Sequence, residues 1–90
     1  LKEEEIKELG AKISEWEIHP KYIERNITFK NFVDAFSFMT KVALLAEKYN
    51  HHPNWENVYS QVRIKLFTHD LGGISNLDHV MASEINNLLE

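Results

Sequence analysis

The sequence predicts an α+β fold, in which a four-stranded antiparallel sheet has helices packed on one face. Two patterns lead to this prediction. Segments whose apolar residues recur at helical spacing are separated by pairs of short segments in which apolar and polar residues alternate. The resulting order is helix, hairpin, helix, hairpin, helix. With 90 residues, the chain has room for a single domain, 1–90, whose small core self-association would help to stabilise.

The first predicted elements are a surface helix and a hairpin. Residues 1–13 are rich in Glu and Lys and carry apolar residues at helical spacing, with Gly10 as the expected helix stop. Strands are expected at 16–18 and 22–29. In the second of them one parity is apolar apart from Arg25 and the other is polar, as in a strand with one exposed face.

The segment 32–49 has the strongest helical periodicity in the chain, and Asn31 provides the N-cap side chain in front of it. The stripe expected to be buried consists of Phe32, Ala35, Phe36, Met39, Val42, Ala43, Ala46 and Tyr49. Three apolar residues, Phe38, Leu44 and Leu45, lie off this stripe. Because a small monomer cannot easily hide a second apolar face, we expect them to form a subunit contact.

The second half of the chain predicts another hairpin and a last helix. Pro53 lacks a backbone donor and therefore ends the preceding helix. Two strands are expected at 56–59 and 62–68, on the basis of alternation in the second of them. Ser75 and Asp78 then have the spacing of a capping box in front of a helix that runs to the end of the sequence.

Composition and charge exclude several classes of function. The formal net charge is −4 and the ten Lys and Arg residues are scattered among acidic ones, so we expect no direct nucleic-acid partner. No apolar run approaches the ~20 residues that span a bilayer, so we expect no membrane association and a cytoplasmic protein. The absence of cysteine excludes thiol nucleophiles and cysteine-bound metals.

Histidine is the residue type best suited to chemistry in this sequence, because its ordinary pKa allows it to move protons near neutral pH. His51 and His52 share a loop after the central helix, and His69 follows a predicted strand. Such places let side chains leave the scaffold and converge. Neighbouring residues of an extended segment point to opposite sides, so the adjacent pair should have separate tasks. We expect His19 and His79 to be ordinary surface residues.

These histidines belong to a longer spaced pattern. It consists of Glu47, three residues, His51-His52-Pro53, five residues, Tyr59, nine residues, His69, eight residues and Asp78. The pattern resembles the signature of the pterin-4a-carbinolamine dehydratase family at every position. The similarity extends beyond the signature over nearly the whole chain, including the stretches 38–48 and 53–59.

The resemblance implies an activity and a set of site residues. Members of the family remove water from 4a-hydroxytetrahydropterin to give quinonoid dihydropterin in tetrahydrobiopterin recycling, without metal or organic cofactor. By resemblance, His51 and His69 would be the acid–base pair, and His52 would mainly bind the pterin. The positions that match the family's pterin pocket are Pro53, Thr68 and Asp70, the last of which is Glu in some relatives.

The remaining signature residues have both functional and structural interpretations. Glu47 lies one helical turn before His51, so its carboxylate is placed to orient or charge-stabilise that imidazole. Asp78 suits a helix cap and a histidine orienter equally well. We expect Tyr59 to pack in the sheet, and Trp55 to be a core or rim aromatic rather than a pterin contact.

Three further hypotheses concern assembly and alternative functions. The family usually forms homotetramers, and we expect assembly through exposed strand edges and the second apolar face of 32–49. A non-catalytic member acting as a dimerisation or transcriptional co-factor is the alternative function, although such relatives generally lose one of the three histidines kept here. A zinc enzyme using these histidines with Glu47 or Asp70 is disfavoured, because adjacent histidines diverge.

Overall fold

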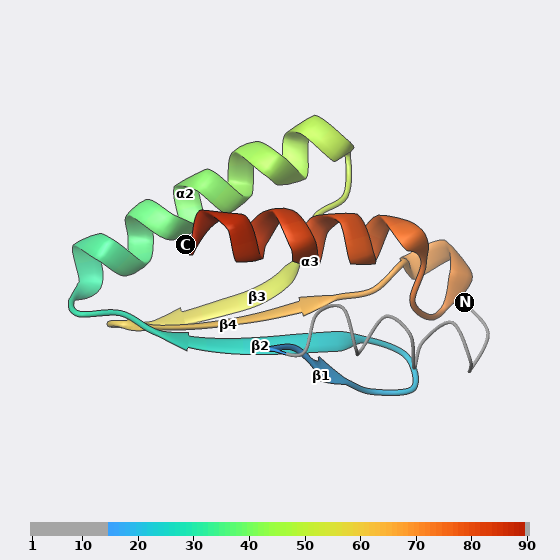
Figure 1. Cartoon of the computed structure of the whole chain (residues 1–90), viewed down its shortest axis with the longest axis horizontal. Helices are drawn as coiled ribbons and strands as arrows, with labels where there is room; N and C mark the ends of the chain where they lie inside the picture. Colours follow the sequence, from blue (N-terminus) through green and yellow to red (C-terminus); the bar gives the residue numbers. More distant parts are fainter. Residues whose placement is uncertain (1–14, 90) are drawn as a thin grey trace.

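The computed structural model of the chain describes residues 15–89, and the predicted helix at 1–13 lies outside this range. Figure 1 shows two long helices lying over one face of a sheet. The strands are β1 (Glu17–Ile18), β2 (Ile23–Thr28), β3 (Asn54–Val58) and β4 (Gln61–Leu66). The helices are α2 (Phe32–Tyr49), the 3-10 turn η1 (His69–Leu71) and α3 (Asn76–Leu88). The predicted α+β fold class is therefore confirmed.

The strand order β1-β2-β4-β3 joins the two predicted hairpins into one sheet, in which every pair is antiparallel. The central pair is β2 with β4, with a register from Ile23 opposite Leu66 to Thr28 opposite Gln61. This pairing unites segments that lie far apart in the sequence. It also leaves β1 and β3 as the two edge strands.

The core lies between the sheet and the two helices. Its sheet residues follow the alternation of β2 and β4, and its helix residues come from the facing sides of α2 and α3. The fully buried members include Ile23, Val62, Ile64 and Leu66 from the sheet, and Val42, Met81 and Ile85 from the helices. Each such side chain contributes about 1.5–3 kcal/mol relative to remaining exposed. No helix within residues 15–89 is both long enough and apolar enough to cross a membrane.

The prediction of which face of α2 is buried was wrong in part. Phe38 is only 4% exposed, whereas Phe32 and Phe36 are 44% and 54% exposed. Leu45 packs against the core as well, so of the three residues expected to form a subunit contact only Leu44 is exposed. The buried arc is shifted because α2 contacts α3 in addition to the sheet, and the sequence does not say on which side α3 lies.

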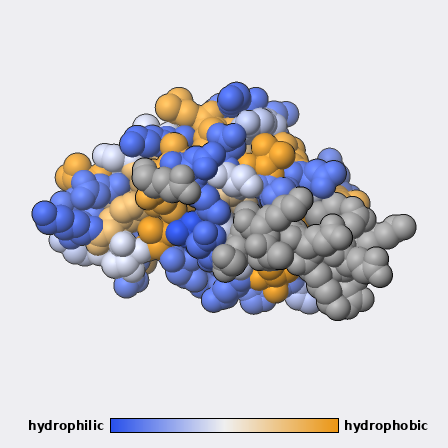
Figure 2. All heavy atoms as spheres, in the orientation of Figure 1, coloured by the Kyte–Doolittle hydropathy of each residue, from blue (hydrophilic) through white to orange (hydrophobic). Residues whose placement is uncertain are grey.

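The shift leaves apolar side chains of α2 at the surface. We call Phe32, Val33, Phe36 and Leu44 the exposed α2 face. In Figure 2, apolar side chains, drawn in orange, reach the surface between polar ones. A surface of this kind on a small domain is a usual feature of a protein contact.

Local backbone features explain where the elements end. Asn31 caps α2 as predicted, accepting a hydrogen bond from the backbone nitrogen of Asp34 at 2.8 Å. The helix ends at Asn50, which has a φ of 50° in the left-handed region, three residues before Pro53. Tyr59 also has a positive φ, of 51°, in the β3–β4 turn. It is 67% exposed, so the expectation that it packs in the sheet is wrong.

Candidate functional site

The three histidines of the predicted site line one cavity of about 370 Å³. It lies where the loop that follows α2 meets the end of β4. The cavity is lined by Asn50, His51, His52, Pro53, Asn54, Phe67 and His69. The structure therefore brings together residues from two segments that the sequence separates.

The left-handed Asn50 decides how the two adjacent histidines point. It turns the chain under the end of α2, and the His51 backbone nitrogen donates to the Ala46 carbonyl at 2.9 Å. The side chain of His51 is 10% exposed, whereas that of His52 is 59% exposed. Each ring faces a different carboxylate, which confirms the prediction that the pair diverges.

His51 is held by a fully buried carboxylate on α3. Its Nε2 forms a short hydrogen bond with Oδ1 of Asp78, which is 0% exposed. The other oxygen, Oδ2, accepts from the backbone nitrogen of Ser75 at 2.8 Å and from the Thr68 hydroxyl at 2.9 Å. Because an ionised carboxylate only accepts, His51 donates through Nε2, and in the neutral ring Nδ1 then carries the lone pair.

Both interpretations of Asp78 are correct, because its two oxygens have different tasks. Oδ2 completes the predicted capping box with Ser75 at the start of α3. Oδ1 fixes the orientation of the His51 ring. The end of α2 and the start of α3 are thus joined through a single carboxylate.

The expected pairing of Glu47 with His51 is wrong. Its Oε2 lies 3.1 Å from Nε2 of His52 instead, and the Glu47 side chain is 77% exposed. The physical reason is again the turn at Asn50, which carries His51 toward α3 and leaves His52 beside the last turn of α2. A spacing of one helical turn cannot predict a pairing once the helix has ended.

The residues that follow β4 differ in role, because some line the cavity and others do not. His69 begins η1, is exposed and lines the cavity. Thr68 and Asp70, predicted as pocket residues, are not among the lining residues. The Thr68 hydroxyl is directed to Asp78, and Asp70 is exposed in η1.

Sequence reasoning missed three residues that line the cavity. Asn50 and Asn54 flank the His-His-Pro sequence and carry no distinctive signal. Phe67 did carry one, because it has the opposite parity to the buried residues of β4 while being aromatic. Its ring centroid lies 6.4 Å from that of His69, with the rings tilted.

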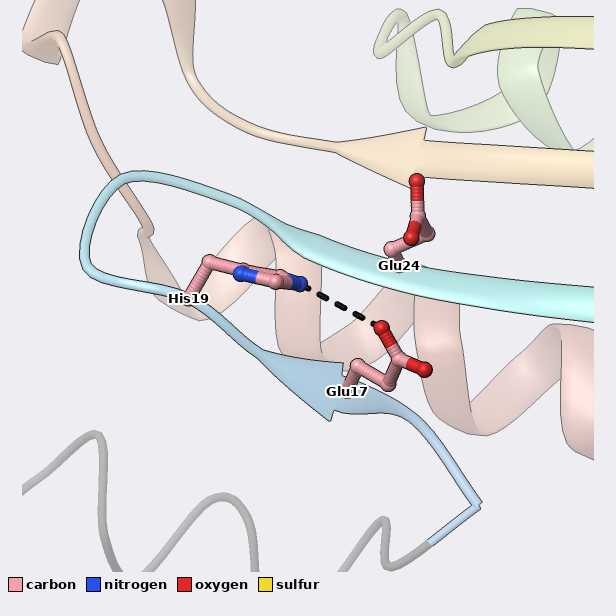
Figure 3. Close-up of side chains that lie close together, drawn as sticks. All are labelled: Glu17, His19 and Glu24. Carbon is pink, nitrogen blue, oxygen red and sulfur yellow. Dashed lines mark hydrogen bonds and ion pairs between the residues drawn. The ribbon is translucent and has the colours of Figure 1, made fainter.

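One group of side chains within residues 15–89 has the spacing of metal ligands, and it lies outside the cavity. Possible ligand atoms of Glu17, His19 and Glu24 come within 4.8 Å of one another on β1, its following turn and β2 (Figure 3). Arg63 and Lys65 approach Glu24 at 3.6 and 4.0 Å. These cations already offset the opposed carboxylates, so we assign no metal to the group.

Fold and site together define a class: a small α+β protein with a histidine-lined cavity, in which one ring is oriented by a buried carboxylate. Such an arrangement is suited to moving protons on a small ligand. The family described as Pterin 4 alpha carbinolamine dehydratase matches residues 1–88, and the chain belongs to that family.

Relatives cover the chain almost end to end. A curated protein of Prochlorococcus marinus subsp. pastoris, named "Putative pterin-4-alpha-carbinolamine dehydratase", is 67% identical over 90 residues, which are 100% of this chain and 94% of that protein. One of the same name from Synechococcus sp. (strain WH7803) is 49% identical over 88 residues, which are 98% of this chain and 95% of the relative.

Solved structures agree in fold. A transcriptional coactivator/pterin dehydratase from Brucella melitensis superposes with a TM-score of 0.95 at 38% identity, covering 100% of this chain and 98% of the other. A pterin dehydratase-like protein described as a RuBisCO assembly factor in the alpha-carboxysome shares the fold, with a TM-score of 0.67 at 20% identity. The match covers 81% of this chain and 84% of that one.

Proposed function

We propose that this protein dehydrates 4a-hydroxytetrahydropterin to quinonoid dihydropterin by histidine acid–base catalysis, as a cytoplasmic step of tetrahydrobiopterin recycling. One observation carries the proposal. His51 is fixed by the buried Asp78 while it lines the same cavity as His69. A cavity that combines an oriented base with a second, unrestrained histidine has both groups that the reaction requires. Family membership supports the choice of substrate.

His51 is suited to be the base. Its Nε2 donates to Asp78, so Nδ1 can take the proton from N5 of the pterin. The imidazolium that forms then lies against a carboxylate already held by Ser75 and Thr68, which stabilises the positive charge without rearrangement. The electrons of the N5–H bond become the second bond between N5 and C4a.

His69 is suited to be the acid. Its side chain is exposed at the start of η1, and the structure of residues 15–89 gives it no carboxylate partner. A protonated His69 can therefore deliver its proton to the hydroxyl on C4a, and the C4a–O bond breaks as water leaves. Exposure lets solvent restore that proton, while His51 returns its own to solvent, so both residues end each cycle as they began.

His52 is suited to binding. It stands at the exposed side of the cavity with Glu47, and Pro53 follows it along the lining. A ring in a solvent-exposed pair with a carboxylate is poorly fixed, so it contributes attraction for the polar pterin rather than a defined proton path. Asp70 on η1 is the remaining pocket residue of the proposal, reached by a ligand that extends past His69.

A direct assay tests this function. In a stopped-flow experiment, 4a-hydroxytetrahydropterin is generated by an aromatic amino-acid hydroxylase, and its decay is followed with and without the protein. We expect saturable acceleration above the spontaneous dehydration, unaffected by a strong chelator. Binding of a reduced pterin such as dihydrobiopterin without any acceleration would support the alternative, a non-catalytic family member acting as a dimerisation or transcriptional co-factor.

The exposed α2 face supports a proposal about assembly. We propose a homotetramer formed through the exposed α2 face, with the edge strands β1 and β3 available for further pairing. Replacing Phe36, which is 54% exposed, with Ser should shift the assembly toward smaller species in light scattering at micromolar concentration. A monodisperse monomer of the unmodified protein would contradict the proposal.

A further inference from the structure

We propose that the side chain of Thr68 is a positioning group, which helps to set the separation of His51 and His69. This inference rests on the proposed function, because it concerns how the acid and the base of that reaction are held. It adds a role for the hydroxyl to the family resemblance, which places Thr68 in the pterin pocket. The structure links Thr68 to both histidines, to one through its side chain and to the other through its backbone.

The side chain of Thr68 is already engaged. Its hydroxyl donates to Oδ2 of Asp78 at 2.9 Å, and the Ser75 hydroxyl lies 2.5 Å from the same Thr68 oxygen. A hydroxyl has one proton, so when the Thr68 proton is on Asp78, Ser75 is the donor in the short contact, and its hydroxyl also lies 3.4 Å from Oδ2 of Asp78. The Thr68 hydroxyl is thus engaged within the protein, and Thr68 is not among the residues that line the cavity of the histidines.

The engaged oxygen of Asp78 determines where His51 lies. Oδ2 is held by Thr68 and by the Ser75 backbone, which leaves Oδ1 facing the His51 ring. Removing the Thr68 hydroxyl would leave Oδ2 held only by Ser75, so the carboxylate could shift about its last bond. A shift of about 1 Å at a reacting group can cost about 10²-fold in rate.

The backbone of Thr68 determines where His69 lies. Its nitrogen donates to the Gly73 carbonyl at 2.7 Å, and its carbonyl accepts from Leu71 and Gly72 at 3.1 and 2.9 Å. These bonds close the η1 turn on both sides of His69. Gly72 has a φ of 69°, which a glycine adopts without strain, so the η1 turn closes without a backbone penalty at this residue.

Matched substitutions separate positioning from binding. Thr68→Val keeps the shape and removes the hydroxyl, Thr68→Ser restores it, and Thr28→Val makes the same change on an exposed strand residue. For Thr68→Val we expect kcat to fall about 10- to 100-fold, with dihydrobiopterin affinity within about twofold of the unmodified protein. Thr68→Ser should recover most of kcat, and Thr28→Val should change neither quantity. A weakened pterin affinity with kcat preserved would overturn the proposal.

A second readout does not depend on activity. In protein labelled with ¹⁵N-histidine, the His51 Nε2 proton should give a downfield resonance because it is donated to a carboxylate. We expect Thr68→Val and Ser75→Ala to shift this resonance, and Thr28→Val and Thr68→Ser to leave it in place. If the unmodified protein has no dehydratase activity, the proposed function fails while this spectrum still tests the linkage. An unchanged His51 signal in a folded Thr68→Val or Ser75→Ala protein would contradict the positioning role.

Discussion

His51 and His52 are neighbours in the sequence and each faces a carboxylate, but the two carboxylates differ in burial and in the hydrogen bonds that hold them. Asp78 is fully buried and its second oxygen is held by two further donors. The Glu47 side chain is 77% exposed, and its contact with His52 lies at the solvent-exposed surface. The comparison teaches that a carboxylate beside a histidine has consequences only when the fold fixes it, since exposed pairs contribute about 0–1 kcal/mol.

The largest expected effect is on the reaction rate when the oriented histidine or its counterpart is removed. His51→Ala and His69→Ala should each lower kcat by about 10²–10⁴-fold, because each takes away one proton-transfer group. The measurement is the stopped-flow assay with the uncatalysed background subtracted. The double variant should lose little more than the single ones if the two residues work as a unit.

Two surface histidines serve as controls for this result. His19 and His79 lie outside the lining of the cavity, so His19→Ala and His79→Ala should retain near-full activity. Should His79→Ala abolish activity while His51→Ala and His69→Ala preserve it, the site is misplaced.

The comparison is sharpened by removing each carboxylate in turn. Asp78→Ala should lower the free energy of unfolding by about 3 kcal/mol, because it deletes a helix cap and leaves buried donors unpaired. Glu47→Ala should lower it by about 0.5 kcal/mol or less. Urea denaturation measures both. Equal losses in the two variants would contradict the contrast between a fixed and a solvent-exposed pair.

A smaller effect is expected for the exposed histidine. His52→Ala should raise KM several-fold while kcat changes little, since a binding residue acts on the ground state and the transition state alike. Steady-state kinetics over a range of carbinolamine concentrations separate the two constants. A loss of kcat as large as that of His51→Ala would show that the difference in exposure between His51 and His52 does not separate a catalytic residue from a binding residue.

The smallest effect concerns the partner of His52. Glu47→Gln keeps the side-chain length and removes the charge, and it should alter pterin affinity by about threefold or less. The difference from the unmodified protein should disappear at ~1 M salt, where the screening length is ~3 Å. Titration calorimetry at low and high salt provides the measurement, and a large salt-independent effect would indicate direct contact of Glu47 with the ligand.

Much of the fold was predictable because it depends on local patterns. The alternation in β4, the periodicity of α2 and the capping box of α3 each lie within one segment, and each prediction is confirmed. The buried face of α2 was predicted less well. Phe36 and Phe38 both fit a helical stripe, and the choice between them depends on the position of α3.

In the candidate site, too, the features that depend on neighbouring residues could be predicted, and those that depend on distant residues could not. The cavity-lining histidines could be selected from their spacing, and their divergence follows from extended geometry. The partner of His51 could not be predicted, because Asp78 lies 27 residues away and the intervening turn at Asn50 redirects the ring. The hydrogen bond from the Thr68 hydroxyl to Asp78 could not be predicted either, because the family resemblance gave only a place at the pocket for Thr68.

The length of the Asp78 side chain has a consequence of its own. Capping boxes commonly use glutamate or glutamine at this position, and an aspartate is shorter by one methylene. A glutamate would move the carboxylate by about 1.5 Å along the side chain, past the point where one oxygen reaches Ser75 while the other meets His51. The length of the side chain at this position therefore sets the distance between the carboxylate and the His51 ring. Glutamate at position 78 would suit the capping box of α3 considered alone. It would, however, place the carboxylate at the wrong distance from the His51 imidazole.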